Sequence, residues 1–197
     1  MNYPEYVEID GEKYKINTDF RVAIECNEIA LDTTIDDEER AMAIIYKLFG
    51  EKGLNDTDKY DKLLELAKKY LGCGKEAEDT NNKPDMDFVE DYSYIKTSFR
   101  SDYGINLDKE DMHWWEFFDL LNGLSNSEMG NCCILNRIRN LRNYDLKDVQ
   151  DTKDRQKIRK AKEMVALKRD LKSKPKPTQE QINNAKEFLN ALGYGGD

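Results

Sequence analysis

Apolar residues recur at helical spacing along most of this 197-residue chain, which predicts a mainly α-helical, bundle-like protein. Steps of three or four residues place side chains on one face of a helix. The clearest example is the aromatic-rich stripe Phe88, Tyr92, Ile95, Phe99 and Tyr103. The same spacing predicts helices over residues 19–31, 34–50, 56–72, 86–103, 113–123, 125–141, 151–171 and 178–193.

One β-hairpin is predicted before the helices. Two β-prone runs, YVEI and KYKI, flank Asp10 and Gly11, and an Asp-Gly turn between such runs is a strong hairpin signal. Their apolar residues alternate with charged ones, so one face of the hairpin is apolar. Two strands alone are marginally stable. We therefore expect the helix over residues 19–31, which is apolar on most of its sides, to lie between the hairpin and the next helices.

Capping residues predict where several helices begin and end. Thr34 is expected to cap the second helix, whose first turn is acidic, and Gly50 to end it. Ser125 and Glu128 form a predicted capping box for the helix that carries Ile134. The helix with the two tryptophans is expected to be capped by an acidic group consisting of Asp108, Glu110 and Asp111.

Charge and composition divide the chain into three predicted regions. Residues 1–83, the hairpin and the first helices, carry a net charge of -8. Residues 84–150, the aromatic-rich region with the HWW segment, carry -6. Residues 151–197 carry +5 and are interpreted as a separable basic helical tail that docks by electrostatic attraction. The Gly-, Asn- and acid-rich residues 72–85 are interpreted as a mobile linker.

No motif in the sequence is typical of an enzyme or of a metal site. The single histidine, His113, excludes a multi-histidine metal site. The four cysteines form no C-x-x-C pair, and phosphate-binding glycine loops, H-E-x-x-H and G-x-S-x-G are all missing. We therefore predict no catalytic, metal-binding or cofactor-binding residue, no cofactor and no enzymatic activity.

The sequence also favours a soluble, intracellular protein. No apolar run approaches the ~20 residues needed to span a bilayer, so we expect no membrane association. The first residues lack the basic and apolar segments of a secretion signal.

Seven residues are predicted to bind partners. In helical phase Trp115 lies outside the core arc that contains Trp114, Phe117 and Leu121. It is either a surface anchor or a side chain packed under a neighbouring helix, and both interpretations stay open. The neighbouring His113 starts the same helix, and the remaining candidates come from the basic tail. The full set is Trp115, His113, Phe188, Leu192, Lys157, Arg159 and Lys160.

The basic stretch of residues 153–176 raises the alternative of nucleic-acid binding. Lysines and arginines contact phosphates, but this stretch contains no aromatic side chain that could stack on bases. The rest of the chain is acidic and would repel nucleic acid. A nucleic-acid-associated role of the tail is therefore kept only as a remote alternative.

Three segments carry a family resemblance: DFVEDYSYIKTSFRSDYGINL, HWWEFFDLLNGL and NRIRNLRNYDLKD. Together they resemble the gene-product-fifteen family of proteins from long-tailed bacteriophages and prophages of Gram-positive bacteria. The resemblance covers most of residues 5–170. Its most specific positions are Tyr94-Ile95, Ser98-Phe99, Tyr103-Gly104-Ile105 and His113-Trp114-Trp115 through Gly123-Leu124.

The resemblance implies a role in tail assembly. Genes of the family lie between those of the tail tube protein and the tape measure protein, the place of tail assembly chaperones. The segments IDGEKYKI and DFRVAIEC also resemble the start of such chaperones. The implied protein binds the tape measure protein, aids assembly of the tail tube protein, self-associates, works in the host cytoplasm and is absent from the mature virion. The alternative is a structural tail completion or connector protein of the virion.

Overall fold

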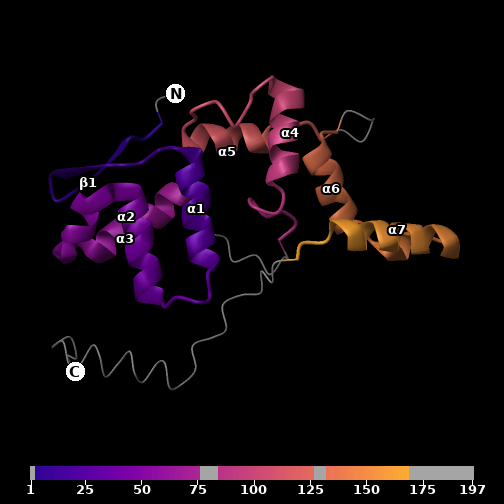
Figure 1. Cartoon of the computed structure of the whole chain (residues 1–197), viewed down its shortest axis with the longest axis horizontal. Helices are drawn as coiled ribbons and strands as arrows, with labels where there is room; N and C mark the ends of the chain where they lie inside the picture. The colour runs from indigo at the N-terminus through magenta and orange to yellow at the C-terminus, as the bar shows by residue number, and fades with distance from the viewer. Residues whose placement is uncertain (1–2, 76–83, 127–131, 169–197) are drawn as a thin grey trace, which may run out of the picture.

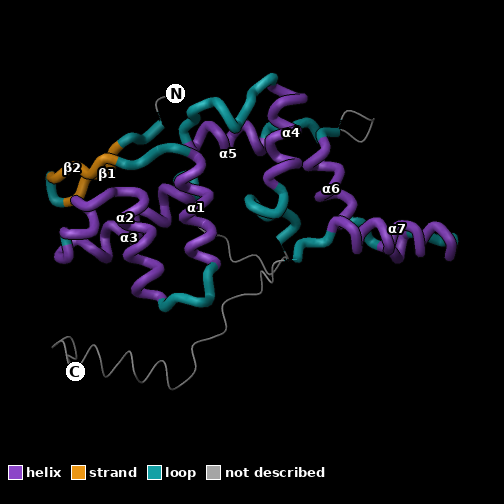
Figure 2. Tube along the Cα trace, in the orientation of Figure 1, coloured by secondary structure: helices purple, strands orange, loops and turns teal. Residues whose placement is uncertain are grey.

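The computed structural model describes residues 3–75, 84–126 and 132–168. In this part of the chain it contains seven α-helices and one two-stranded antiparallel sheet (Figures 1 and 2). The predicted mainly α fold with one N-terminal β-hairpin is therefore confirmed. The elements are β1 (Tyr6–Ile9), β2 (Glu12–Lys15), α1 (Phe20–Leu31), α2 (Asp37–Asn55), the 3-10 turn η1 (Thr57–Lys59), α3 (Tyr60–Leu71), α4 (Tyr92–Tyr103), α5 (Trp114–Asn122), α6 (Ile134–Asn143), η2 (Leu146–Asp148) and α7 (Thr152–Val165).

The hairpin forms at the predicted Asp-Gly turn. Asp10 and Gly11 both have positive φ angles, 52° and 80°, as a tight hairpin turn requires. β1 packs on α3 and β2 packs on α2, whereas α1 packs on α2 and α5. The prediction that α1 separates the hairpin from the next helices is therefore wrong, because the apolar face of the hairpin is covered directly by α2 and α3.

Stacked aromatic rings join the two halves of the chain into one core. The ring of Phe117 on α5 lies 4.7 Å from that of Phe20 on α1 and 5.1 Å from that of Phe99 on α4. Trp114 stacks on Phe117 at 5.7 Å. Phe20, Phe99 and Phe117 are fully buried. Because full burial of such a side chain contributes roughly 1.5–3 kcal/mol, these rings hold α1, α4 and α5 together.

Two predicted helix starts are wrong because other side chains cap the backbone. Asp36, not Thr34, caps α2 and forms a capping box with Glu39. α6 begins at Ile134 and is capped by Cys133, so the predicted box at Ser125 does not start it. The predicted end of α2 is correct in part. Gly50 interrupts the regular helix with a φ of 67°, but a further turn follows to Asn55.

α4 begins at Tyr92, six residues later than predicted. The preceding residues form turns because two aspartates bind the backbone: Asp91 accepts from the Asp87 N–H at 3.1 Å, and Asp87 makes two further bonds. The Asp87 Oδ1 accepts hydrogen bonds from the N–H groups of Val89 and Glu90, both at 2.8 Å. Such side-chain bonds compete with helix formation. The predicted end is correct, since Gly104 adopts a left-handed conformation with a φ of 71°.

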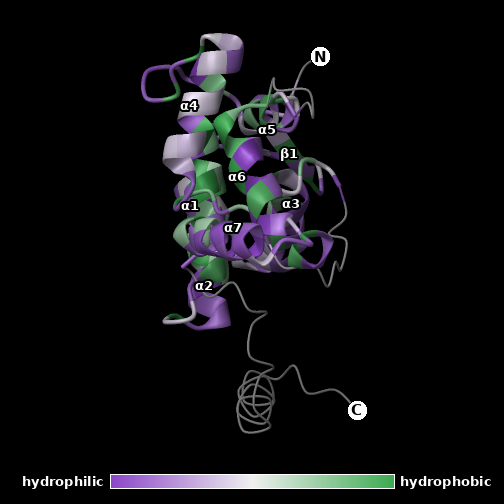
Figure 3. Ribbon diagram, turned by 90° about the vertical axis from the view of Figure 1, so that its right-hand side faces the viewer, coloured by the Kyte–Doolittle hydropathy of each residue, from purple (hydrophilic) through white to green (hydrophobic). Residues whose placement is uncertain are grey.

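The last described helix, α7, projects from the body of the molecule (Figure 1). It packs on α6 and on η2, and none of its residues is buried. Its ribbon is largely hydrophilic in Figure 3. The helix predicted to reach residue 171 ends at Val165, while the predicted last helix and most of the predicted linker lie outside the described residues. The division into three regions stays a prediction.

Candidate functional site

The HWW segment is fixed by backbone pairing with the start of α1. Asp19 and His113 form an antiparallel bridge. The N–H of Trp114 donates to the Thr18 carbonyl at 2.8 Å, and the N–H of Phe20 donates to the Met112 carbonyl at 3.1 Å. The start of α5 is therefore anchored beside the start of α1, and the side chains of the segment have defined positions.

His113 is the N-cap of α5, so the predicted cap formed by Asp108, Glu110 and Asp111 is wrong. The His113 Nδ1 accepts a hydrogen bond from the N–H of Trp115 at 3.0 Å. Its Nε2 lies 3.1 Å from the Pro4 carbonyl oxygen, so the geometry assigns the ring proton to Nε2. The ring also stacks on Tyr3 at 5.0 Å. Both nitrogens are thus occupied, and the predicted binding role of His113 stays a prediction.

Trp115 is half-buried and packs on the end of α3. Its Nε1 donates to the Tyr70 carbonyl at 2.9 Å, and its ring stacks on that of Tyr70 at 6.1 Å. A Cβ added at Gly74 would lie 3.2 Å from the Trp115 ring. Of the two interpretations of Trp115, the structure shows the one in which the side chain packs against a neighbouring helix. Because the side chain is only half-buried, partner binding by Trp115 stays a prediction.

Three titratable groups, Cys26, Cys73 and Tyr70, are shifted towards their neutral forms. Burial raises the pKa of the Cys26 thiol to about 12 and that of Cys73 to about 11, so both stay protonated at neutral pH. Burial also raises the pKa of Tyr70, whose hydroxyl is buried and has no hydrogen-bond partner among the described residues. These shifts follow from desolvation and activate no nucleophile.

A search of the described ranges finds no group of three or more His, Cys, Asp or Glu side chains arranged to hold a metal ion. Over the same ranges, no helix combines the length and the apolar character needed to cross a membrane.

A buried ion pair joins α6 to the residue that precedes α4. Arg142 on α6 binds the Asp91 carboxylate with both Nη atoms, at 2.6 and 2.7 Å. The Asp91 side chain is 1% exposed and that of Arg142 is 10% exposed. Such a two-pronged pair is strong and directional. The hydrogen bonds to Asp91, together with its negative charge, raise the pKa of Arg142.

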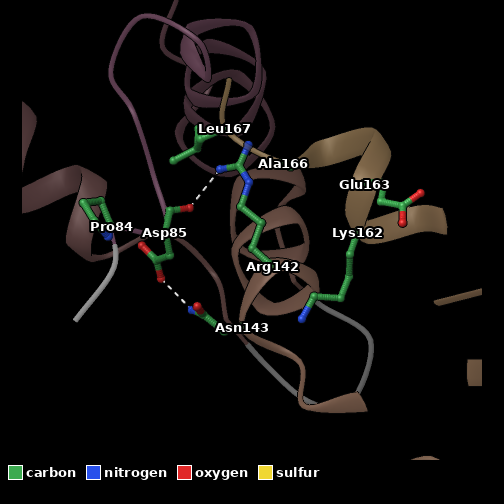
Figure 4. Close-up of a pocket in the computed structure, with 8 residues that line it drawn as sticks. All are labelled: Pro84, Asp85, Arg142, Asn143, Lys162, Glu163, Ala166 and Leu167. Atoms are coloured by element: carbon green, nitrogen blue, oxygen red, sulfur yellow. Dashed lines mark hydrogen bonds between the residues drawn. The ribbon is translucent and has the colours of Figure 1, made fainter. Parts of the chain in front are cut away.

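Arg142 connects three segments of the chain. Besides Asp91, it donates through Nη1 to the Asp85 carbonyl at 2.8 Å and through Nε to the Val165 carbonyl at 2.6 Å. A cavity of about 260 Å³ lies beside it (Figure 4). Because the guanidinium bonds are directed to the protein itself, the cavity presents no arginine charge for an anion. Its lining residues are Pro84, Asp85, Arg142, Asn143, Lys162, Glu163, Ala166 and Leu167.

The basic candidates of the tail lie on the solvent side of α7. Lys157, Arg159 and Lys160 are all exposed. The helix is held to α6 by its opposite face, on which Ile158, Ala161 and Val165 are half-buried. The remaining two candidates, Phe188 and Leu192, lie outside the described residues. None of these placements tests partner binding.

Sequence reasoning missed two features: the pair between Asp91 and Arg142, and the exposure of Met164. Asp91 and Arg142 are 51 positions apart, and nothing in their local sequence indicates that they pair. The exposure of Met164, which is 86% accessible, could have been predicted from the sequence. Helical phase places it away from Ile158 and Val165, the residues that cover α6.

The comparison with protein families gives one result. The family model described as Bacteriophage Gp15 protein matches residues 2–167, which is most of the chain and all of the described helices. No curated protein and no solved structure matches. The chain belongs to the Bacteriophage Gp15 protein family.

Proposed function

We propose that this phage protein is a tail assembly chaperone that binds the tape measure protein and aids tail tube assembly. The supporting observation is the set of large apolar side chains that reach solvent from several elements. A chaperone of a long apolar client needs apolar side chains that the client can reach, and several elements of this chain offer them. They are Tyr6, Leu31, Met42, Tyr46, Val89, Tyr144 and Met164, between 41% and 86% exposed.

Charge supports the same proposal. The formal net charge of the chain is -9, and a net charge far from zero keeps a complex with an apolar client soluble. Exposed methionines suit a varied client, because the unbranched side chain adapts its shape. We further propose that the protein acts without catalysis or cofactor, in the host cytoplasm.

Co-expression with the tape measure protein tests the proposal. The chaperone should keep the client in the soluble fraction and should be recovered with it in a pull-down. Replacing Tyr6 and Tyr144 by serine should lower client recovery while the circular dichroism spectrum stays unchanged. The matched control replaces Thr97 and Ser93, which are exposed on a helix, by alanine. Unchanged recovery with the first variant would contradict a role of these exposed side chains.

Mass spectrometry of purified particles separates this proposal from the alternative. A chaperone is released before the particle is complete, so its peptides should be missing while tail tube peptides are abundant. Recovery in a fixed ratio to tail proteins would instead establish a structural tail completion or connector protein.

A further inference from the structure

The solvent face of α7 carries a ridge of three lysines and one exposed methionine, here called the basic ridge: Lys153, Lys157, Lys160 and Met164. Steps of four, three and four residues place these side chains on one helix face. Met164 is 86% exposed. The only ion pair of the ridge among the described residues is between Lys157 and Asp154 at 2.9 Å, and such an exposed pair contributes little.

A second ridge of opposite charge lies on the solvent face of α2. This acidic ridge consists of Glu38, Glu39, Met42 and Tyr46, all exposed. Met42 is 41% and Tyr46 is 49% accessible. The opposite side of the helix carries Ile44, Ile45 and Leu48, which are buried in the core. The acidic ridge is therefore the solvent face of a firmly packed helix, on which Glu39 also accepts a hydrogen bond from the Asp36 N–H.

We propose that the basic ridge of one copy docks on the acidic ridge of a second copy of this chain. The charges are complementary, and each ridge ends in exposed apolar side chains. On α7, Lys160 precedes Met164 by four residues, and on α2, Glu38 precedes Met42 by four residues. Both separations are about 6 Å along the helix axis. A parallel alignment of the two helices therefore brings lysine to glutamate and methionine to methionine.

The two ridges lie on different parts of the molecule, so the contact is not self-complementary. α2 belongs to the hairpin end of the body, and α7 projects from the other end (Figure 1). After two copies dock, the pair still has a free acidic ridge at one end and a free basic ridge at the other. Contacts of this heterologous kind produce rings or open chains of copies. The inference deepens the proposed function, because such a series of copies could follow a long client. The contact itself needs no client.

Sedimentation of the full chain at two salt concentrations tests the contact. Self-association should be strong at about 50 mM salt and weaken at about 0.5 M, because the charges are screened. Two variants each disable one ridge: Lys160→Gln with Met164→Ser, and Glu38→Gln with Met42→Ser. Each should lower the association constant at low salt by about tenfold or more. The matched control, Lys69→Gln with Val89→Ser, should associate like the unchanged protein.

Mixing the two variants gives the decisive result. Each retains one intact ridge, so the mixture should form a pair of unlike copies and no longer series. A protein that is monomeric at low salt, a mixture without pairs, or variants that associate normally would each overturn the proposal. If the variant of the basic ridge associates normally but binds a short DNA duplex more weakly than the unchanged protein, the proposal is overturned in favour of nucleic-acid binding. None of these outcomes depends on whether the tape measure protein is the client.

Discussion

The hairpin end of the molecule and its α7 end are held by different forces. In residues 3–75 the hairpin and α1 to α3 share a core with large fully buried side chains such as Tyr14, Ile45 and Leu63. At the other end, α7 buries no residue. It is held by half-buried contacts with α6 and by polar bonds such as Arg142 to the Val165 carbonyl. Local unfolding should therefore cost more free energy in residues 3–75 than in α7, which is attached at few points.

The difference separates what folds the protein from what it can present to a partner. A helix with no buried residue contributes little to the core, so selection for stability leaves its solvent face free. The core helices α1, α4 and α5 are instead tied to one another by stacked rings. Mutations should therefore lower the free energy of unfolding most in the core, less at the contacts of Arg142 and least on exposed elements.

The largest effect is expected for Phe117→Ala. This ring stacks on Phe20, Phe99 and Trp114 and is fully buried, so its loss leaves a cavity between three helices. The free energy of unfolding should fall by about 3–5 kcal/mol, measured by urea denaturation. Phe118→Ala, on the same helix but half-buried, should cost less. Equal effects of the two changes would contradict the stacked core.

The next effect is expected for Arg142→Met. The change removes the partner of the buried Asp91 carboxylate and the bond to the Val165 carbonyl. Breaking a buried pair by removing one partner costs about 3–5 kcal/mol; we expect the lower end, because residues near α7 can rearrange. Amide hydrogen exchange should speed up in α7 and in residues 84–91, and little in α2.

A second variant shows whether the unpaired charge causes that loss. In Arg142→Met combined with Asp91→Leu, no buried charge remains without a partner, so part of the stability should return. If the double variant is as unstable as Arg142→Met, the pair matters for its hydrogen bonds to several segments rather than for charge balance.

The fold was predictable where local chemistry and packing favour the same structure. The Asp-Gly hairpin, the helix over residues 19–31 and the end of α4 at Gly104 all have signals within a few residues. The errors occur where two local signals compete. Asp36 and Thr34 are both good caps, and only the side-chain bond to Glu39 decides between them. Asp87 diverts the chain into turns before α4.

The surface was less predictable, because exposure depends on neighbours far along the chain. Trp115 lies outside the core arc of its own helix, yet Tyr70 on α3 covers it. His113 bonds to Pro4 across 109 positions. Helical phase is more informative for α7, which packs on α6 and the short turn η2, because Ile158 and Val165 are half-buried there while Lys157 and Lys160 are exposed.

A small effect on the body is expected from ending the chain after Gln150. This change removes α7, which buries no residue. The Arg142 bond to Val165 is lost, but its pair with Asp91 stays. The free energy of unfolding should change by less than about 1 kcal/mol, and the transition should stay cooperative. Loss of the cooperative transition would show that α7 belongs to the core and that the comparison of the two ends is mistaken.

The smallest effect is expected at the ionic cluster on the hairpin, which also tests whether charge matters less at that end. Lys52 and Lys59 bind the Glu12 carboxylate at 2.7 and 2.6 Å and lower its pKa to about 2 from 4.5. Since the folded pKa lies below the unfolded one, the stabilisation is complete above about pH 4.5 and is lost as the pH falls towards 2. Glu12 is solvent-accessible, so the gain is small.

In urea denaturation, Glu12→Gln should lower the midpoint slightly at pH 7, and the difference should vanish towards pH 2. The control Glu51→Gln, also exposed at this end, should show no such convergence. A shift at pH 7 as large as that of Arg142→Met would mean that charge holds the hairpin as firmly as it holds the junction with α7, and the contrast between the two ends would fail.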